Sequence, residues 1–511
     1  MAFLRSIATI GSYTMLSRLT GFARDMLVAA LLGAGPVADA FFVAFKLPNF
    51  FRRLFAEGAF NSAFVPIFAG ALEEGRAAAR AFAEDTLAIL TLVLLVFTIA
   101  CQVFMPWIMH VLAPGFADDP GKFALAVEMA RITFPYLLFV SLSSQLSGVL
   151  NSLGRFAVAA AAPIILNLSM IATLLLLARY TATPGHALAW GVALAGVLQF
   201  AMLMWACHAA GFAPRMPWPR LTPRAKTMLK RMVPGAIGAG GVQVNLVVDV
   251  VIASFLPTGA ISFLYYADRL NQLPLGVVGV AVSTALLPVL SRDLARGDAS
   301  AADEKLNRAI ELAWLLTVPA ACALAVLAIP IVSVLFERGA FGHDATQKTA
   351  AALAAYAAGL PAYVLVKVFG PPFFARGDTV TPVKIALIAI AVNTALAIAL
   401  AFPLAHVGVA LATAIAAWGN AGMLLATLMR RGFYAVDGRL KRRLPRIIVA
   451  SAAMTAVLYG VALIAPGGRI VALAILVVAG GLAFALAALA CGAAELGELK
   501  RLVRKPTGTS S

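Results

Sequence analysis

The sequence predicts an all-α polytopic membrane protein with 14 transmembrane helices, arranged as two six-helix lobes in a parallel repeat plus two extra C-terminal helices. Composition is the first observation: 62% of the 511 residues are hydrophobic and 12% are charged, whereas soluble domains average about 45–50% and 25%. Apolar segments of about 20 to 30 residues, long enough for a helix to cross a bilayer, are the second. The third is an internal repeat. The polar stretches between segments are too short to enclose a soluble core.

Hydropathy, with glycine and proline setting the ends, divides the chain into fourteen spans. The first contains Arg18 and Arg24 and precedes no cleavage-like site, so it is interpreted as a retained helix and not as a signal peptide. In chain order the spans are roughly 4–33, 37–68, 84–113, 123–153, 157–180, 186–211, 233–256, 259–290, 308–336, 346–374, 379–402, 406–430, 445–464 and 469–492.

The loops between spans differ in charge. One alternate set, with both termini, carries most of the loop lysines and arginines, including clusters in 211–231 and 430–446. By the positive-inside rule both termini are therefore cytoplasmic. The same asymmetry explains the net charge of +17 without nucleic acid. The opposite set of loops holds little more than Lys122, Arg179, Arg338, Lys348 and Arg469.

An internal repeat relates the two halves of the chain. VPIFAGALEEG at 65–75 and LPVLSRDLARG at 287–297 share their proline, leucine and glycine positions, and GVAL recurs at 191–194 and 408–411. Because an even number of helices per half keeps the same orientation in the membrane, the two lobes are related by an axis along the membrane normal. A substrate site is therefore expected between the lobes near the midplane. The predicted parts are an N-terminal lobe at 1–213, a basic cytoplasmic linker at 214–232, a C-terminal lobe at 233–432, and spans 13 and 14 with a cytoplasmic tail at 433–511.

The first two spans carry charges that the other spans mostly avoid. Each would cost about 2.5–3.5 kcal/mol facing lipid, so they are expected to face a watery cavity or a partner. Residues seven apart nearly share a helix face, which places Asp39, Lys46 and Arg53 on one stripe and Arg18 with Asp25 on another. The set is Arg18, Arg24, Asp25, Asp39, Lys46, Arg52, Arg53 and Glu57.

The second lobe repeats part of this pattern, because ADRL at 267–270 parallels AFKL at 44–47 and so places Asp268 and Arg269 in the helix that corresponds to Lys46. A cavity lined in this way is cationic, with a few carboxylates to pair the arginines when it is empty. The planar arginine fork suits bidentate contact with phosphate. The expected cargo is therefore anionic, a phosphate or diphosphate.

Several of the charges in apolar spans also have a structural explanation. Cations at the end of a span act as topology determinants, lysines extend to the interface, and opposite charges form ion pairs. Asp249, in the middle of a span, is either a coupling-ion ligand or the partner of an arginine from the first lobe. Arg52 and Arg53 are explained as topology determinants at the end of a span, and Lys46 and Lys367 as lysines that extend to the interface. The pairs Arg24–Asp25 and Asp268–Arg269 are explained as structural ion pairs.

No cofactor or enzyme chemistry is indicated. The four cysteines, at 101, 207, 322 and 491, lie singly in apolar helices and form neither a metal-binding spacing nor a disulfide framework. A transferase acting on polyprenyl diphosphate would need a cluster of metal-binding carboxylates, and Asp118 and Asp119 have no third carboxylate nearby. A non-transporting scaffold would not need a cationic interior.

The charged run SRLTGFARDMLVAALLGAGPVADAFFVAFKLPNFFRRLFAEGAFNSAFVPIF at 17–68 resembles the signature of the MurJ/MviN proteins, the bacterial lipid II flippases. YYADRL at 265–270, followed by Leu287 and Pro288, and RGDTVTPVK at 376–384 agree with it. The resemblance covers essentially the whole chain, including the six plus six plus two arrangement of spans. It implies a non-enzymatic transporter of the multidrug/oligosaccharidyl-lipid/polysaccharide exporter superfamily, working by alternating access in the bacterial inner membrane.

The implied cargo is lipid II, an undecaprenyl-diphosphate-linked glycopeptide that is moved to the outer leaflet for peptidoglycan biosynthesis, cell wall biogenesis and cell shape. The alternatives are another polyprenyl-diphosphate glycan or a multidrug exporter of the same superfamily. A monomeric transport unit among membrane lipids is expected, coupled to membrane potential or to a gradient of H⁺ or Na⁺.

The resemblance also implies residue roles. The last two helices would form a groove for the lipid tail. The resemblance assigns substrate binding to Arg18, Arg24, Arg52 and Arg269. It assigns roles in lining or gating the cavity to Asp25, Asp39, Lys46, Arg53, Glu57 and Asp268.

Overall fold

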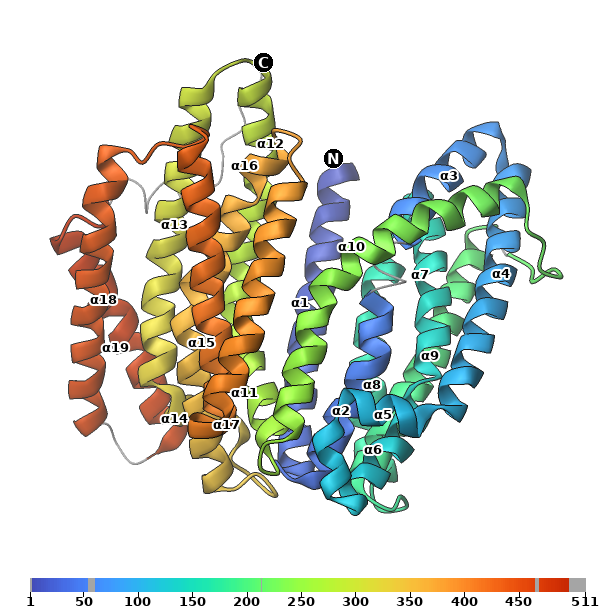
Figure 1. Ribbon diagram of the computed structural model, residues 1–511, viewed down its shortest axis with the longest axis horizontal. Helices are drawn as coiled ribbons and strands as arrows, with labels where there is room; N and C mark the ends of the chain where they lie inside the picture. Colours follow the sequence, from blue (N-terminus) through green and yellow to red (C-terminus); the bar gives the residue numbers. More distant parts are fainter. Residues whose placement is uncertain (1, 54–59, 213, 465–467, 496–511) are drawn as a thin grey trace. The chain divides into compact units, whose positions relative to one another are not determined.

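The computed structural model describes residues 2–53, 60–212, 214–464 and 468–495, and these ranges contain helices and no strand (Figure 1). Within them nine helices are long and apolar enough to cross a membrane. The prediction of an all-helical, multi-pass membrane protein is therefore confirmed. The chain divides into two compact units, of which the first comprises Met1–Ser262 and Arg338–Gly342 and the second comprises Phe263–Glu337 and His343–Ser511.

The first unit is a helical bundle in which several helices start at prolines. α2, α6, α9 and α10 each have a proline in the first turn, where its missing N–H costs no hydrogen bond. A ladder of Phe60, Phe64 and Phe68, at helical spacing, stacks at centroid distances of 5.1 and 5.4 Å in its core. The elements are α1 (Ala2–Leu32), α2 (Pro36–Phe51), α3 (Asn61–Glu74), α4 (Arg76–Val103), α5 (Met105–Leu112), η2 (Pro114–Asp118), α6 (Pro120–Thr133), α7 (Tyr136–Ser152), α8 (Phe156–Leu177), α9 (Pro184–Ala209) and α10 (Pro223–Ser254).

The sequence predicts a single span at 259–290, but in the structure a short π-helix divides it after Pro274. Proline cannot donate a backbone hydrogen bond, which interrupts the α-helix here. The elements of the second unit are α11 (Ala260–Pro274), η3 (Leu275–Gly279), α12 (Val280–Ala295), α13 (Ala299–Val326), α14 (Ala328–Phe336), α15 (His343–Phe369), α16 (Pro371–Phe374), α17 (Val380–Arg430), α18 (Gly438–Ile464) and α19 (Arg469–Ala490).

The long element α17 is bent at Ala405, where φ is 47° and ψ is −132°. Gly408 permits the bend, because a Cβ there would lie 2.1 Å from the backbone oxygen of Leu400. At the corner, the His406 ring nitrogen Nε2 lies 2.9 Å from the carbonyl oxygen of Lys348. The bend falls where hydropathy separates the spans 379–402 and 406–430, so α17 consists of two helical segments.

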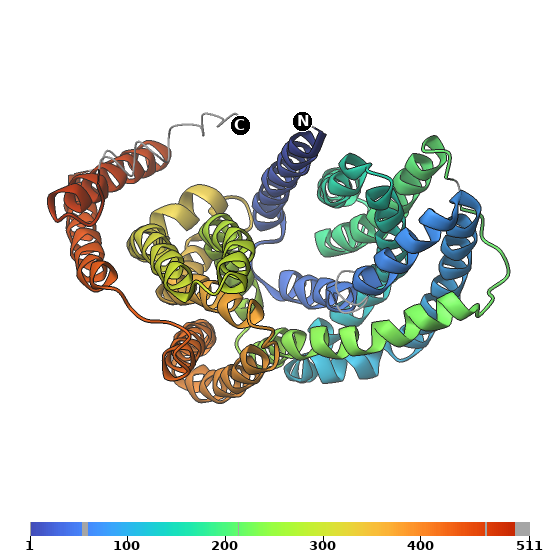
Figure 2. The same cartoon turned by 90° about the horizontal axis from the view of Figure 1, so that it is seen from above.

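The predicted basic linker at 214–232 is only partly a loop, because α10 starts at Pro223. Figure 2 shows α10 lengthwise, as a long continuous helix. Its first turn is tied to α3 by an ion pair of 2.5 Å between Arg224 and Glu74. α10 belongs to the first compact unit, although hydropathy places it in the second lobe. The lobe boundaries stay a prediction.

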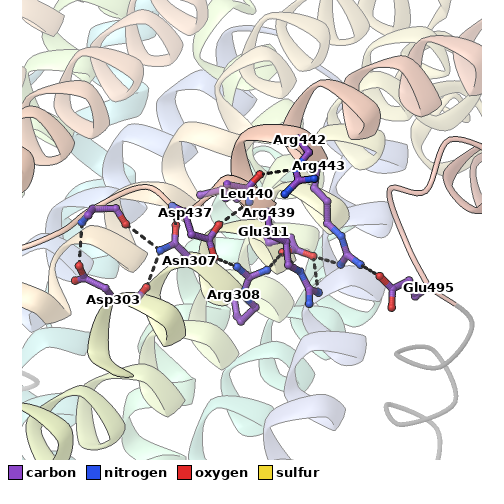
Figure 3. Close-up of polar contacts among 12 residues, drawn as sticks. Asp303, Asn307, Arg308, Glu311, Asp437, Arg439, Leu440, Arg442, Arg443 and Glu495 are labelled. Carbon is purple, nitrogen blue, oxygen red and sulfur yellow. Dashed lines mark hydrogen bonds and ion pairs between the residues drawn. The ribbon is translucent and has the colours of Figure 1, made fainter. Parts of the chain in front are cut away.

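An ion-pair cluster around Glu311 fastens α18 to α13 (Figure 3). The carboxylate of Glu311 is buried and accepts hydrogen bonds from Arg308 on its own helix and from Arg439 and Arg443 on α18. Arg443 also donates to Glu495 at 2.6 Å. Because both side chains of the Glu311–Arg443 pair are almost fully buried, each needs the other as its counter-charge.

Glu311→Ala is expected to lower the free energy of unfolding by about 3 kcal/mol, since it leaves a buried guanidinium without this partner. Thermal or denaturant unfolding in detergent measures the change. The control is Glu304→Ala on the exposed face of the same helix, where a change within about 0.5 kcal/mol is expected. Equal losses in the two variants would contradict a role of the cluster in fastening α18.

Candidate functional site

Arg24 is buried between α1 and α8, with a relative exposure of 4%. Its Nε and Nη2 donate to one oxygen of Asp25 at 3.0 and 2.6 Å, and its Nη1 donates to Oδ1 of Asn167 at 2.9 Å. Asn167 in turn donates to the backbone oxygen of Ser17 at 3.0 Å. The predicted pair Arg24–Asp25 is therefore present, and an amide from α8 completes it.

Arg18 differs from Arg24 because it is exposed, although both lie on α1. The sequence places Arg18 and Asp25 on one stripe, but the carboxylate of Asp25 is buried against Arg24. Of these two arginines, Arg18 is therefore the one that a ligand can reach without breaking the Arg24–Asp25 ion pair.

The predicted stripe on α2 runs from buried to exposed. Asp39 is 1% exposed, Lys46 is half-buried and Arg53 is exposed. Arg52, beside the stripe, is half-buried and donates to Oδ1 of Asn49 at 3.2 Å. Glu57 lies outside the described residues. The charges at the far end of α2 are consequently the accessible ones.

Asp39, on α2, joins α6 and the start of α11, whose residues up to Ser262 belong to the first unit. Its carboxylate accepts hydrogen bonds from Nζ of Lys122 at 2.9 Å, from the backbone N–H of Gly259 at 2.8 Å, and from Ser262 through the N–H at 3.0 Å and the hydroxyl at 2.6 Å. Unpaired N–H groups at the start of a helix favour an acceptor and a negative charge. Asp39 therefore holds the start of α11 against α2 and α6.

Hydropathy places Lys122 among the loop cations, and helical periodicity predicts neither Lys122 nor Ser262 as a partner of Asp39. Lys122 is in fact 5% exposed and lies 4.2 Å from the ring centroid of Phe116. One signal was present: Lys122 occupies the first turn of a helix, where the helix dipole disfavours a cation. Such a position calls for a nearby carboxylate.

The charged residues of α11 make contacts along their own helix. Arg269 donates to the hydroxyl of Tyr265 at 3.1 and 3.2 Å and lies 5.1 Å from its ring centroid. Asp268 accepts a hydrogen bond from Gln272. Both charged side chains are half-buried. A guanidinium held on an aromatic face keeps a fixed direction for a ligand.

Asp249, the predicted coupling residue, is half-buried on α10. The amide of Asn245, one turn earlier, lies 3.4 Å from its carboxylate. Within the described ranges, His, Cys, Asp and Glu side chains form no group of three that could hold a metal ion. Ion coupling through Asp249 stays a prediction.

The motif RGDTVTPVK, at 376–384, includes the first turn of α17 and the residues just before it. Asp378 accepts from the backbone N–H groups of Val380 and Thr381 at 3.1 and 2.9 Å and from Arg431 at 2.6 Å. These contacts lower the pKa of Asp378 to about 2, first through the Thr381 side chain, then its backbone N–H and Arg431. Arg431 follows the last residue of α17, so the motif ties the two ends of this bent element together.

Comparisons with known proteins agree with this architecture. The fold resembles that of an inward-facing multidrug resistance MATE family transporter of the MOP superfamily, with a TM-score of 0.66, 14% identity, and coverage of 83% of this chain and 98% of that one. It resembles the structure titled "Lipid II flippase MurJ, inward closed conformation" more strongly, with a TM-score of 0.81, 27% identity, and coverage of 97% and 99%.

The protein is thus a polytopic membrane protein with a fold found in transporters. The family model described as "Lipid II flippase MurJ" matches residues 28–479. "Probable lipid II flippase MurJ" of Rhizobium meliloti (strain 1021) is 49% identical, covering 90% of this chain and 86% of its own. "Lipid II flippase MurJ" of Burkholderia cenocepacia is 38% identical, covering 85% of each chain. The chain belongs to the lipid II flippase MurJ family, and the resemblance noted in the sequence is confirmed.

Asp39→Asn is expected to lower the free energy of unfolding by about 3 kcal/mol, because it leaves the ammonium of Lys122 buried without a counter-charge. Adding Lys122→Gln removes that charge, so the double variant is expected to lose about 1–3 kcal/mol less than the sum of the single variants. Thermal unfolding of the four proteins measures this interaction energy.

The exposed pair Asp344–Lys348 supplies the control. Its cycle of Asp344→Asn and Lys348→Gln is expected to yield an interaction energy below about 1 kcal/mol. An Asp39–Lys122 cycle as weak as the control would contradict the assigned role of Asp39.

Proposed function

We propose that this protein is a lipid II flippase that moves the undecaprenyl-diphosphate-linked precursor of peptidoglycan from the inner to the outer leaflet of the cytoplasmic membrane. Family membership and the names of its relatives support this proposal. The observation that carries it is the setting of Arg24, whose fork is satisfied by a carboxylate and an amide inside an apolar bundle. A fork that binds one oxyanion in this way also suits a diphosphate.

Asp25 then acts as an internal substitute for the diphosphate. While the site is empty, Asp25 neutralises Arg24 and lowers the cost of holding a guanidinium away from water. An incoming diphosphate first meets the exposed Arg18 and then displaces Asp25 from Arg24. Arg52 and Arg269 supply further guanidinium groups to a cationic cavity that opens alternately to the two sides of the membrane.

The proposed architecture has fourteen transmembrane helices, two lobes and cytoplasmic termini, and functions as a monomer. α18 and α19 provide the surface for the polyprenyl tail. In support of this role, only 11% of the most apolar window of α19 is buried, and Val478, Leu482 and Leu486 project from it.

Two alternative cargoes would place different demands on the charged residues of the site. A different polyprenyl-diphosphate glycan would use the same arginines, because the diphosphate is shared. A multidrug exporter of cationic compounds would need an excess of carboxylates, which the charged residues of α1 and α2 do not provide. Depletion of the protein separates these alternatives from the main proposal.

Depletion in the native host is expected to accumulate lipid II in the inner leaflet, and the wild-type gene to restore its translocation. Arg18→Ala is expected to express and unfold normally, because the side chain is exposed, yet to reduce translocation at least about tenfold if one charged contact of about 1.4 kcal/mol is lost. Accessibility of lipid II to an external probe measures both.

Arg179→Ala, an exposed arginine far along the chain, is the matched control and is expected to translocate normally. Arg24→Lys tests the fork, since lysine keeps the charge but loses bidentate geometry. Normal translocation in both Arg18→Ala and Arg24→Lys would contradict a role of these arginines in recognising the diphosphate. Depletion without any change in lipid II would exclude the proposed cargo.

Membrane potential is proposed as the driving force, because a net cationic cavity responds to the field at about 2.3 kcal/mol per charge per 100 mV. Translocation in vesicles is expected to slow when valinomycin collapses the potential at fixed H⁺ and Na⁺ gradients. An unchanged rate under this treatment, with loss of transport on collapsing an ion gradient, would favour coupling through Asp249 or Asp39 instead.

A further inference from the structure

The second unit contains a cavity of about 460 Å³ between α12, α15, α16 and α17, the elements labelled in Figure 1. This volume falls within the range of about 300–1,000 Å³ that is typical of small-ligand sites. Most of the lining is apolar, with Leu287, Val366 and Phe374 among the larger side chains. Four residues bring polar groups to the lining: Lys367, Asn420, Ser283 and Thr284.

Lys367 is the unusual member of this lining. It lies in the last turn of α15, within a segment apolar and long enough to cross a membrane. The side chain is half-buried, and among the residues that the structure describes no carboxylate pairs with it. The carbonyl end of a helix compensates a cation only in part. An ammonium in such a setting favours an anion.

The neighbouring backbone makes room for this lysine. Gly279 in the π-helix η3 faces it, and a Cβ at that position would lie 3.1 Å from Cδ of Lys367. The aliphatic part of the side chain therefore packs on the π-helix that follows Pro274. This packing holds the lysine along the cavity wall.

Asn420 narrows the chemistry of the anion. Its Oδ1 is buried and has no hydrogen-bond partner in the described part of the chain. A buried acceptor without a partner costs about 1–3 kcal/mol, so the cavity lacks a donor at this position. A carboxylate cannot provide one, whereas a singly protonated phosphate monoester has both a P–OH donor and anionic oxygens.

We propose that this cavity binds the phosphate monoester head of an amphiphile. The anionic oxygens contact the ammonium of Lys367 and the hydroxyl groups of Ser283 and Thr284, and the P–OH group donates to Asn420. The hydrocarbon chain lies on the apolar lining. The arginines of the proposed transport site are not among the lining residues, so this site is separate from it.

Binding of dodecyl phosphate to the full-length protein in phosphatidylcholine nanodiscs tests this site, with empty nanodiscs as the reference for partitioning into lipid. Dodecyl phosphate is expected to bind at least about tenfold more tightly than dodecanol or inorganic phosphate, which corresponds to about 1.4 kcal/mol. Dodecanol binding equally well would overturn the anion site. Inorganic phosphate competing at the same concentration would overturn the amphiphile and leave a free-anion site.

Variants of the lining complete the test. Lys367→Gln is expected to weaken dodecyl phosphate binding about tenfold. Lys348→Gln, at an exposed position on the same helix, is expected to leave binding unchanged. Asn420→Asp supplies the lysine with a carboxylate from the protein itself, so it is expected to abolish binding while the thermal unfolding midpoint is maintained. Unchanged affinity in both Lys367→Gln and Asn420→Asp would refute the proposal.

Discussion

A charge placed inside an apolar helical bundle must be compensated by other protein groups, because little water is present to solvate it. In this structure the compensating groups come from helices distant in sequence. Arg24 reaches Asn167 on α8, Asp39 reaches Lys122 on α6 and the start of α11, and Glu311 reaches α18. Each buried charge therefore also connects helices, and the architecture depends on these connections.

The connections differ in what must move when a charge changes partner. The counter-ion of Arg24 is its neighbour Asp25 on the same helix, so a ligand can replace Asp25 by side-chain rotation. The partners of Asp39 belong to α6 and to the turn before α11, so releasing that carboxylate separates backbone elements. The counter-ion of Arg24 can therefore be exchanged without moving a helix, whereas that of Asp39 cannot.

Much of this fold follows from local sequence. Hydropathy and the glycine and proline positions predict the apolar spans and the break at Ala405, and the cost of buried charge identifies Arg24 and Asp39 as unusual. The partners Asn167 and Ser262 do not follow, because helical periodicity specifies the face of a residue but not the distant helix that meets it. Hydropathy also does not predict the early start of α10 or the π-helix η3, although Pro223 and Pro274 mark their positions in the sequence.

The same electrostatic requirement explains why two cations on long apolar helices, Arg443 on α18 and Lys367 on α15, have different roles. Arg443 is 5% exposed and meets Glu311 and Glu495, so its charge is balanced by the fold and serves stability. Lys367 is half-buried beside a cavity and meets no carboxylate among the described residues. Because folding does not provide its counter-charge, Lys367 is available to the anion proposed above. Compensation within the protein thus separates structural charges from those that remain available to a ligand.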